Sequence, residues 1–187
     1  MHPRDRAPSG PNGPGYSFIE LSAVLAIAGI LLAAATPSFI HTVRDNRIAT
    51  QVNLLLANVH LARMEAIKRN QDVVLCRSKD GRQCNRSSRA RTDWSDGWIV
   101  YVNPDGDKKR DPDEPLLQVQ SGVPPGMTLR FNQWWRVIYH ADGSARNGSF
   151  SLCDSRGSEG ARTLVLFYTG RPRVSDRKSN GDPIDCD

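Results

Sequence analysis

The chain begins with a long apolar run that contains a single charged side chain. Between Tyr16 and Ile40 that side chain is Glu20, and the run has the length of a helix that crosses a bilayer. A carboxylate in hydrocarbon is strongly unfavourable without a counter-charge, so a cationic partner is expected. A free amino group on Tyr16, produced by cleavage after Gly15 and supplied by a neighbouring copy, would be such a partner.

Beyond this run, apolar residues recur at alternating spacings of four and three, which places them on one stripe of a helix. They are Ile48, Val52, Leu55, Val59, Ala62 and Ala66. Polar residues at 42–47 mark where the chain leaves the lipid, and residues 68–70 (Lys-Arg-Asn) form a basic helix end. The pattern predicts one helix from about Ser17 to Asn70, with a membrane half and an amphipathic half that packs on a sheet.

After Asn70 the chain consists of short runs rich in β-branched and aromatic residues, separated by polar turns. This pattern predicts an antiparallel sheet. Turns are expected where Gly, Pro, Asn and Asp cluster, at residues 103–106, 124–126, 142–143 and 147–148. The expected strands are Val73–Arg77, Trp98–Val102, Leu116–Val119, Thr128–Phe131, Val137–Tyr139, Phe150–Cys153, Thr163–Tyr168 and Arg173–Ser175.

Composition fits one exported domain behind a membrane anchor, because about 145 residues follow the membrane half of the helix and suffice for a single core. The formal net charge is +5, but residues 63–91 hold nine bases and three acids, whereas residues 93–114 hold seven acids and three bases. A second basic cluster contains Arg162, Arg171, Arg173, Arg177 and Lys178. Such separation indicates either an anion-binding face or solvated charged loops.

Four cysteines follow the membrane segment, at Cys76, Cys84, Cys153 and Cys186. None lies in a CxxC pair, so metal binding is weakly supported, and no metal or cofactor is expected. An even number in an exported domain favours two disulfides, with three pairings open. We favour a bridge from Cys76 to Cys84, which closes a short loop, and one from Cys153 to Cys186, which pins the C-terminal tail to a strand.

The N-terminal pattern resembles that of the type IV pilin and pseudopilin family. The matching features are a short polar leader, Gly15 at the cut, an aromatic first mature residue, Tyr16, and Glu20 as the fifth. An uncleaved anchor would explain the apolar run but neither Gly15 nor Glu20. The resemblance implies an α+β type IV pilin fold with a leader at 1–15, a membrane-spanning and filament-core helix at 16–40, an amphipathic half at 41–70 and a β-rich domain at 71–187.

Three segments of the globular part look like the FimT/GspH group of minor pilins and pseudopilins, and most like its FimT side: Val74–Arg77, Trp94–Tyr101 and Phe150–Asp154. The resemblance implies a non-enzymatic, single-pass subunit of the inner membrane with a periplasmic C-terminal domain. Prepilin peptidase would cleave and N-methylate it. The mature subunit would then join other pilins in a filament or near its tip.

On the FimT side of this group, a GRxR motif in a C-terminal loop is associated with DNA binding during natural transformation, and residues 170–173 match it. Gly170 permits a tight turn, and the guanidinium groups of Arg171 and Arg173 can reach phosphate oxygens. Nearby Arg177 and Lys178 would extend the patch. Two alternatives remain: a hairpin turn whose arginines face water, and a GspH-like pseudopilin of a type II secretion system, which has a structural role and needs no DNA affinity.

Other motifs are weaker. Trp134-Trp135-Arg136 could stack the bases of a single strand, although adjacent strand residues point to opposite faces and at least one Trp is expected in packing. Residues 175–178 match the SxxK pattern of serine acyl-enzymes, but the KTG motif that accompanies it is absent. The match is therefore attributed to chance. The acidic stretch after Asn103 fails as an EF-hand, because Tyr101 and Pro112 take the first and twelfth ligand positions. Two interpretations of this stretch remain, an acidic turn and an irregular calcium site.

Overall fold

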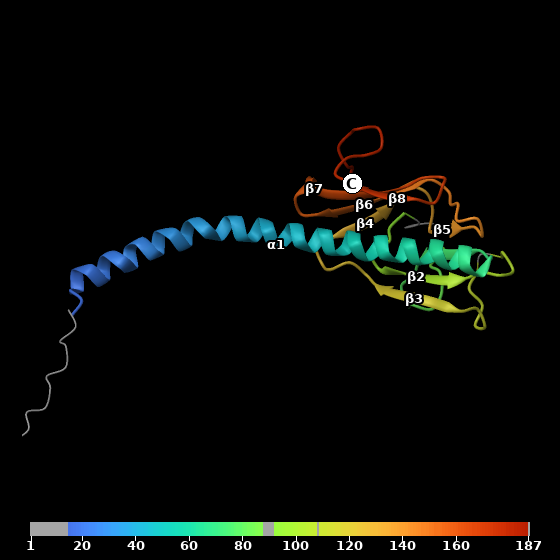
Figure 1. The fold of residues 1–187 in the computed structure, drawn as a ribbon, viewed down its shortest axis with the longest axis horizontal. Helices are drawn as coiled ribbons and strands as arrows, with labels where there is room; N and C mark the ends of the chain where they lie inside the picture. The colour runs from blue at the N-terminus through green and yellow to red at the C-terminus, as the bar shows by residue number, and fades with distance from the viewer. Residues whose placement is uncertain (1–14, 88–91, 108, 187) are drawn as a thin grey trace, which may run out of the picture. The chain divides into compact units, whose positions relative to one another are not determined.

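The computed structural model describes residues 15–87, 92–107 and 109–186, without the side chains of residues 33–38. The described residues form one long helix, α1 (Phe18–Arg69), and eight strands (Figure 1). They belong to two compact units, Met1–Val43 and Arg44–Asp187. Apart from Gly15, the predicted leader lies outside the described residues.

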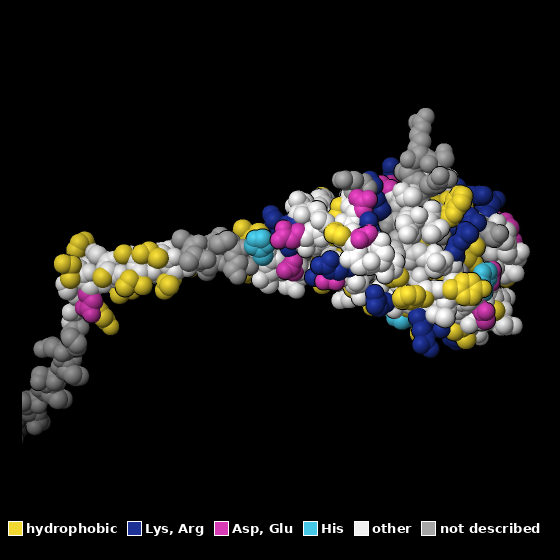
Figure 2. All heavy atoms as spheres, turned by 90° about the horizontal axis from the view of Figure 1, so that it is seen from above, with side chains coloured by type: hydrophobic (Ala, Val, Ile, Leu, Met, Phe, Trp, Pro, Cys, Tyr) yellow, Lys and Arg dark blue, Asp and Glu magenta, His cyan; other side chains and the backbone are white. Residues whose placement is uncertain are grey.

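In the first unit, α1 begins at Phe18 and holds Glu20 in its first turn. Exposed apolar side chains surround the described part of this segment (Figure 2). Among the residues that the structure describes, no helical stretch combines the length and the apolar character required to span a bilayer.

In the second unit, α1 buries the stripe predicted from its spacing. All six apolar residues of that stripe, from Ile48 to Ala66, are almost fully buried and belong to the main core. The helix ends at Arg69 because Asn70 adopts a left-handed conformation with φ of 54°. The amide of Gln71 then donates to the carbonyl of Ala66, which satisfies a helix end in the usual way. The predicted C-terminus of the helix is therefore confirmed to within one residue.

The strands form two antiparallel four-stranded sheets instead of one. The first sheet has the order β3-β2-β1-β5 and the second has the order β4-β6-β7-β8. The strands are β1 (Val73–Arg77), β2 (Gly97–Val102), β3 (Leu116–Ser121), β4 (Thr128–Phe131), β5 (Arg136–Tyr139), β6 (Gly148–Asp154), β7 (Gly157–Leu166) and β8 (Pro172–Ser175).

The main core lies between the second half of α1 and the inner faces of both sheets. Alternate residues of each strand point inward, as in β4, where Leu129 and Phe131 are buried and their neighbours are exposed. Trp94 makes edge-to-face contacts with Phe131 and Phe150, whose rings stack on each other with centroids 4.2 Å apart. This aromatic cluster joins the segment before β2 to the second sheet.

Two smaller clusters, each containing a disulfide, contribute buried residues outside this core. The bridge from Cys76 to Cys84 belongs to a cluster with Val74, Ile99 and Trp135. The bridge from Cys153 to Cys186 belongs to a cluster with Ala161 and Ile184. These are the two pairings that we favoured from the sequence. The second bridge attaches the C-terminal tail to β6.

Strand β7 differs most from its predicted position. It begins at Gly157 instead of Thr163 and ends at Leu166 instead of Tyr168. Of the added residues, Arg162 pairs with Leu152, and Gly157 pairs with Asp154 after a register shift. Phe167 and Tyr168 leave the strand because they begin the turn that leads to β8.

Candidate functional site

The turn between β7 and β8 carries the GRxR motif, and Gly170 shapes it. Gly170 has φ of +71°, and its amide donates to the carbonyl of Phe167 at 2.8 Å. A Cβ at this position would overlap the carbonyl oxygen of Gly143, so only glycine allows the two segments to approach so closely. The Tyr139 hydroxyl donates to the Gly170 carbonyl at 3.3 Å. The turn is therefore seated on the segment that follows β5.

A residue of α1 also contributes to the support of this turn. The Gly143 carbonyl, which meets Gly170, also accepts a hydrogen bond of 3.1 Å from Arg63 Nε on the helix. Burial raises the pKa of Tyr139, so its phenol stays protonated and able to donate. The sequence indicated a turn at Asp142-Gly143 but gave no sign that it would meet Gly170. The contact joins residues that are far apart in the chain.

Arg171 and Arg173 extend from this supported backbone into solvent. Both are exposed, and neither side chain makes a hydrogen bond or ion pair with another described residue. Arg173 lies opposite Val165, whereas Pro172 and Val174 lie opposite the core residues Leu166 and Leu164. Because strand residues alternate, Arg173 points to the outer face of the second sheet. The two guanidinium groups are thus available to an anion.

Arg177 and Lys178 follow in the tail, where the backbone forms a small loop. The Lys178 amide donates to the Asp182 carbonyl at 2.9 Å, and Arg177 Nη1 donates to the Gly181 carbonyl at 3.3 Å. The nearby bridge to Cys186 holds this loop against the second sheet. Arg162 lines a shallow hollow of about 420 Å³ together with Arg173 and the acidic Asp176.

The outer face of the second sheet is polar. A groove of about 470 Å³ runs between this face and the tail, and Ser149, Ser151 and Thr163 lie along it, with Arg130 and Lys178 at its sides. Figure 2 shows one face of the domain, on which Lys and Arg side chains are interspersed with hydrophobic ones. Arg173 and Lys178 of the second basic cluster therefore lie on or beside this outer face, whereas Arg162 pairs with the core residue Leu152 and lies on the inner side of β7.

In the first basic cluster, Arg77 is not a surface residue. Its side chain is 4 % exposed and donates to the carbonyls of Asn85 and Ser87 at 2.7 and 2.8 Å and to that of Asp93 at 3.2 Å. Burial lowers its pKa, partly offset by Asp93 and Asp96. Strand alternation was the available signal, because it places Arg77 on the inner face with Val73 and Leu75.

The two adjacent tryptophans lie just before β5, which begins at Arg136, and they differ in burial. Trp135 is 7 % exposed, and its ring is covered by Arg136 and Arg86, whose guanidinium carbons lie 4.2 and 5.2 Å from the ring centroid. Trp134 is 46 % exposed. Of the predicted stacking platform, only Trp134 presents a large accessible surface.

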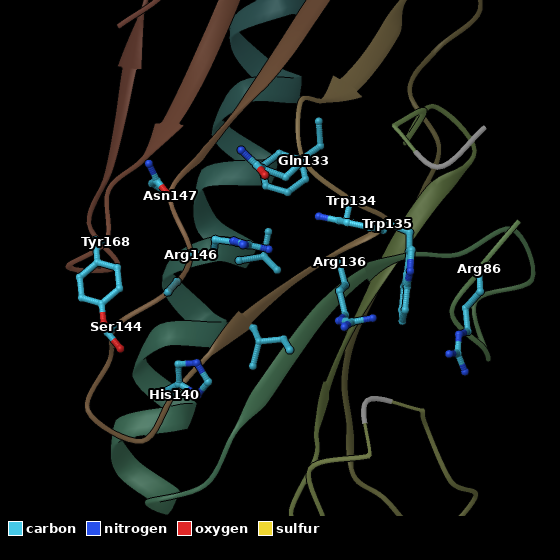
Figure 3. A pocket seen from close by; sticks show the side chains of 14 residues that line it. Arg86, Gln133, Trp134, Trp135, Arg136, His140, Ser144, Arg146, Asn147 and Tyr168 are labelled. Carbon is cyan, nitrogen blue, oxygen red and sulfur yellow. The ribbon is translucent and has the colours of Figure 1, made fainter. Parts of the chain in front are cut away.

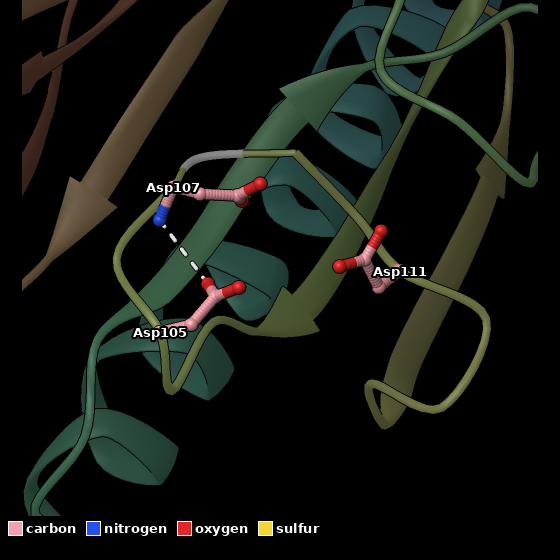
Figure 4. A group of neighbouring side chains, drawn as sticks. All are labelled: Asp105, Asp107 and Asp111. Carbon is pink, nitrogen blue, oxygen red and sulfur yellow. Dashed lines mark hydrogen bonds between the residues drawn. The ribbon is translucent and has the colours of Figure 1, made fainter.

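The acidic stretch forms a hydrogen-bonded loop between β2 and β3. Carboxylate oxygens of Asp105, Asp107 and Asp111 all lie within 4.8 Å of one another, and the Asp107 amide donates to Asp105 (Figure 4). Glu114 accepts from the Asp111 amide at 2.8 Å, and burial raises its pKa, as do the neighbouring aspartates. Exposed carboxylates that cap backbone amides are typical of acidic turns, and the irregular calcium site stays a hypothesis.

The residues predicted for processing and assembly lie at the start of the first unit. Gly15 and Tyr16 precede the helix and are exposed, and Glu20 is exposed in its first turn. They lie in a different compact unit from the turn with the GRxR motif. Their roles stay predictions.

The comparisons with known proteins agree with this fold. Residues 51–170 match the family model described as type II transport protein GspH. A pilin-like protein of Thermus thermophilus, PilA1, is 29 % identical over 164 residues, covering 85 % of this chain and 89 % of that protein.

Among solved structures, the type IV minor pilin FimU of Pseudomonas aeruginosa is similar with a TM-score of 0.57 and 20 % identity, covering 75 % of this chain and 96 % of FimU. A second crystal form of FimU gives a TM-score of 0.55. At this identity the likeness concerns the fold alone, whereas the family match spans most of the chain. The chain therefore belongs to the GspH family and is a minor pilin or pseudopilin.

Proposed function

We propose that this protein is a non-enzymatic minor pilin of a type IV pilus, on the FimT side of its family, that binds DNA for uptake during natural transformation. In this proposal, prepilin peptidase removes the leader after Gly15 and methylates Tyr16. Residues 16–40 anchor the subunit in the inner membrane, with its C-terminal domain in the periplasm, until it joins other pilins. The pilin-like relative and the family match support the filament role.

The observation that carries DNA binding is the way the turn is built. Arg171 and Arg173 are exposed and unpaired among the described residues, while Gly170 between the strands is buried and fixed against Gly143. Because the backbone is already ordered, little conformational entropy is lost when the arginines meet phosphates. Arg177 and Lys178 follow in the tail, where Lys178 borders the outer face of the same sheet.

Such a site binds the phosphate backbone without reading sequence. A few arginine–phosphate contacts give weak binding that falls steeply as salt concentration rises. Several subunits or neighbouring tip proteins would then raise the overall affinity through avidity. The proposal therefore predicts modest affinity for the isolated protein.

The test is binding of labelled DNA to the full chain in detergent, followed by fluorescence anisotropy over a range of salt concentrations. The R171Q/R173Q variant should weaken binding by about tenfold or more, because charge-assisted hydrogen bonds are lost. It should also reduce the slope of log affinity against log salt by about two. The matched control is R47Q/R82Q, which removes the same charge from exposed sites outside the second basic cluster. Equal losses in both variants would show that only net charge matters.

Processing is tested separately. Mass spectrometry of protein from cells with an active prepilin peptidase should find Tyr16 as a methylated N-terminus. The E20Q variant should insert into the membrane as the native protein does but enter filaments poorly, because the counter-charge for the Tyr16 amine is lost. An intact leader in such cells would contradict this part of the proposal.

A second candidate, a pseudopilin of a type II secretion system, is favoured by the description of the matching family. In that role the subunit caps a short periplasmic filament and has no DNA ligand. Deletion of the gene should then abolish secretion and leave transformation unchanged. The pilus proposal predicts the opposite result, so one deletion strain assayed for both processes separates the two.

A further inference from the structure

A groove of about 670 Å³ lies beside β5, between that strand and the segment Ser144–Asn147 that leads into β6. Figure 3 shows Trp134 and Arg136 on the side of β5, with Arg146 and Tyr168 on the opposite side. Four separate parts of the chain therefore contribute to it: the loop with Arg86, the start of β5, the segment before β6 and the turn before β8.

The groove offers two accessible aromatic rings. Trp134 is 46 % exposed and Tyr168 is 76 % exposed, although large aromatic side chains are usually buried in a monomeric domain. Trp134 has a fixed backbone, because its carbonyl accepts a hydrogen bond from the buried Trp94 ring at 3.4 Å. Tyr168 lies in the turn held by Gly170. Both rings are thus presented from ordered segments.

The groove is also cationic. Arg86 and Arg136 both lie over the Trp135 ring, and burial together with the nearby Arg86 lowers the pKa of Arg136. Arg146 adds a third cation. None of the described residues that line the groove is acidic. Two carboxylates contact lining residues at its edge, where His140 lies 3.0 Å from Asp72 and the Ser144 amide donates to Asp142 at 2.8 Å. Three arginines and no acidic residue among the described residues of the lining favour an anionic ligand.

Exposed aromatic rings, next to arginines that form no ion pair with a described residue, fit a nucleotide better than a polypeptide. A nucleotide combines an aromatic base with a phosphate, and stacking of a base on an aromatic side chain contributes roughly 1–3 kcal/mol. Only unpaired bases are free to stack in this way, because duplex bases are already stacked on each other. Tyr168 also lies three residues before Arg171, so a strand bound in the groove can continue to the turn.

We propose that this groove binds single-stranded DNA, with bases stacked on Trp134 and Tyr168 and phosphates in contact with Arg86, Arg136 and Arg146. The inference rests on the proposed function for its ligand, but it uses different residues and adds a preference for single strands over duplex.

The test compares a fluorescent 15-nucleotide oligo(dT) with a 15-base-pair duplex, using the full chain in detergent at one salt concentration. The W134L/Y168L variant should lose about 30-fold or more in affinity for oligo(dT), as expected for two stacked bases. Its affinity for the duplex should change less than about twofold, because no charge is lost. The W134F variant keeps an aromatic ring and should retain most of the oligo(dT) affinity.

Folding is controlled by the thermal unfolding midpoint. If the double variant is destabilised, Y168L alone decides the matter, because this ring is mostly exposed and should be removable without loss of the core. An affinity for oligo(dT) equal to that of the native protein, or an equal loss on both DNAs, would overturn the proposal. So would a loss of binding to another pilin subunit with DNA binding intact, since the groove would then be a protein interface.

The two proposals fail separately. Loss of oligo(dT) binding in W134L/Y168L but not in R171Q/R173Q would support the groove and overturn the turn as the DNA site. The reverse result would overturn the groove and support the turn. A native protein that binds neither DNA would overturn both.

Discussion

The loop that follows β1 and the turn that precedes β8 both carry arginines, but these arginines have opposite roles. In the loop, Arg77 is buried, and its guanidinium group donates to the backbone carbonyls of Asn85, Ser87 and Asp93. In the turn, backbone contacts around Gly170 provide the support, and Arg171 and Arg173 extend outward. An arginine that organises the fold is thus occupied by the protein. An arginine on a backbone that is supported without it is available to a ligand.

The largest expected effect comes from removing the supporting arginine. The R77M substitution should destabilise the protein by about 3 kcal/mol or more, because several buried carbonyls lose their donors. R77K should recover only part of this loss, since one ammonium group cannot replace the planar fork. Chemical denaturation measures the free energy of unfolding, with R82M as an exposed control. A loss below about 1 kcal/mol would show that the loop does not depend on Arg77.

The supporting backbone of the turn is tested by G170A. The change should cost about 2 kcal/mol or more, because it combines a positive φ with an overlap against the Gly143 carbonyl. The matched control is G126A, which has φ of +83° and open space around the Cβ position. It should cost about 1 kcal/mol, from the conformation alone. Equal losses at the two positions would mean that the contact with Gly143 contributes nothing.

Arg156 is a third case, because it forms ion pairs with carboxylates. Arg77, in contrast, binds backbone carbonyls, and the arginines of the turn are exposed. It binds Asp154 at 2.8 Å and Asp45 of α1 at 2.6 Å. The hydrogen bonds from Arg156 lower the pKa of Asp154 below its ordinary value of 3.8. A lowered folded-state pKa contributes stability above the unfolded-state pKa, and this contribution is lost as pH falls through the folded value.

The native protein should therefore lose stability progressively as pH falls below about 5. At neutral pH the D154N variant should be less stable by about 1 kcal/mol, because a charge-assisted pair becomes a weaker bond. The difference should shrink as the solution is acidified. Unfolding curves for both proteins at pH 7, 5 and 3 measure it. A difference that is constant with pH would exclude a contribution from this pair.

The smallest expected effect on stability is that of R171Q/R173Q. Since neither side chain supports the backbone, the free energy of unfolding should stay within about 0.5 kcal/mol of the native value. The same variant is expected to show a large loss of DNA binding. A substantial loss of stability would mean that these arginines belong with Arg77 as structural residues, and the contrast between the two regions would disappear.

Most secondary structure could be predicted because each element has a local signal. The stripe from Ile48 to Ala66 located the amphipathic half of α1, and β-branched runs located the strands. The start of β7 had no such signal, since residues 157–160 (Gly-Ser-Glu-Gly) contain no β-branched or aromatic side chain. The strand reaches back to Gly157 because that residue pairs with Asp154 of β6. The division into two sheets likewise depends on pairing between distant segments.

The candidate site was predictable only in part. The motif of Arg171 and Arg173 is contiguous, so it could be recognised in the sequence. Trp134 could also be recognised, because it is an aromatic residue close to the basic residue Arg136. Tyr168 and Arg146 carried no local sign of a shared role, because only the folded chain brings them to one groove with Trp134. The burial of Arg77 could have been inferred from alternation along β1.

The position of the bridge between Cys153 and Cys186 also determines how late in synthesis this disulfide can form. Its two cysteines are 33 residues apart, and the later one follows the whole of the last strand. The bond cannot close until every strand and the tail have emerged from the ribosome and reached an oxidising compartment. A chain that stops before Cys186 leaves a thiol on β6, so incomplete molecules differ chemically from complete ones.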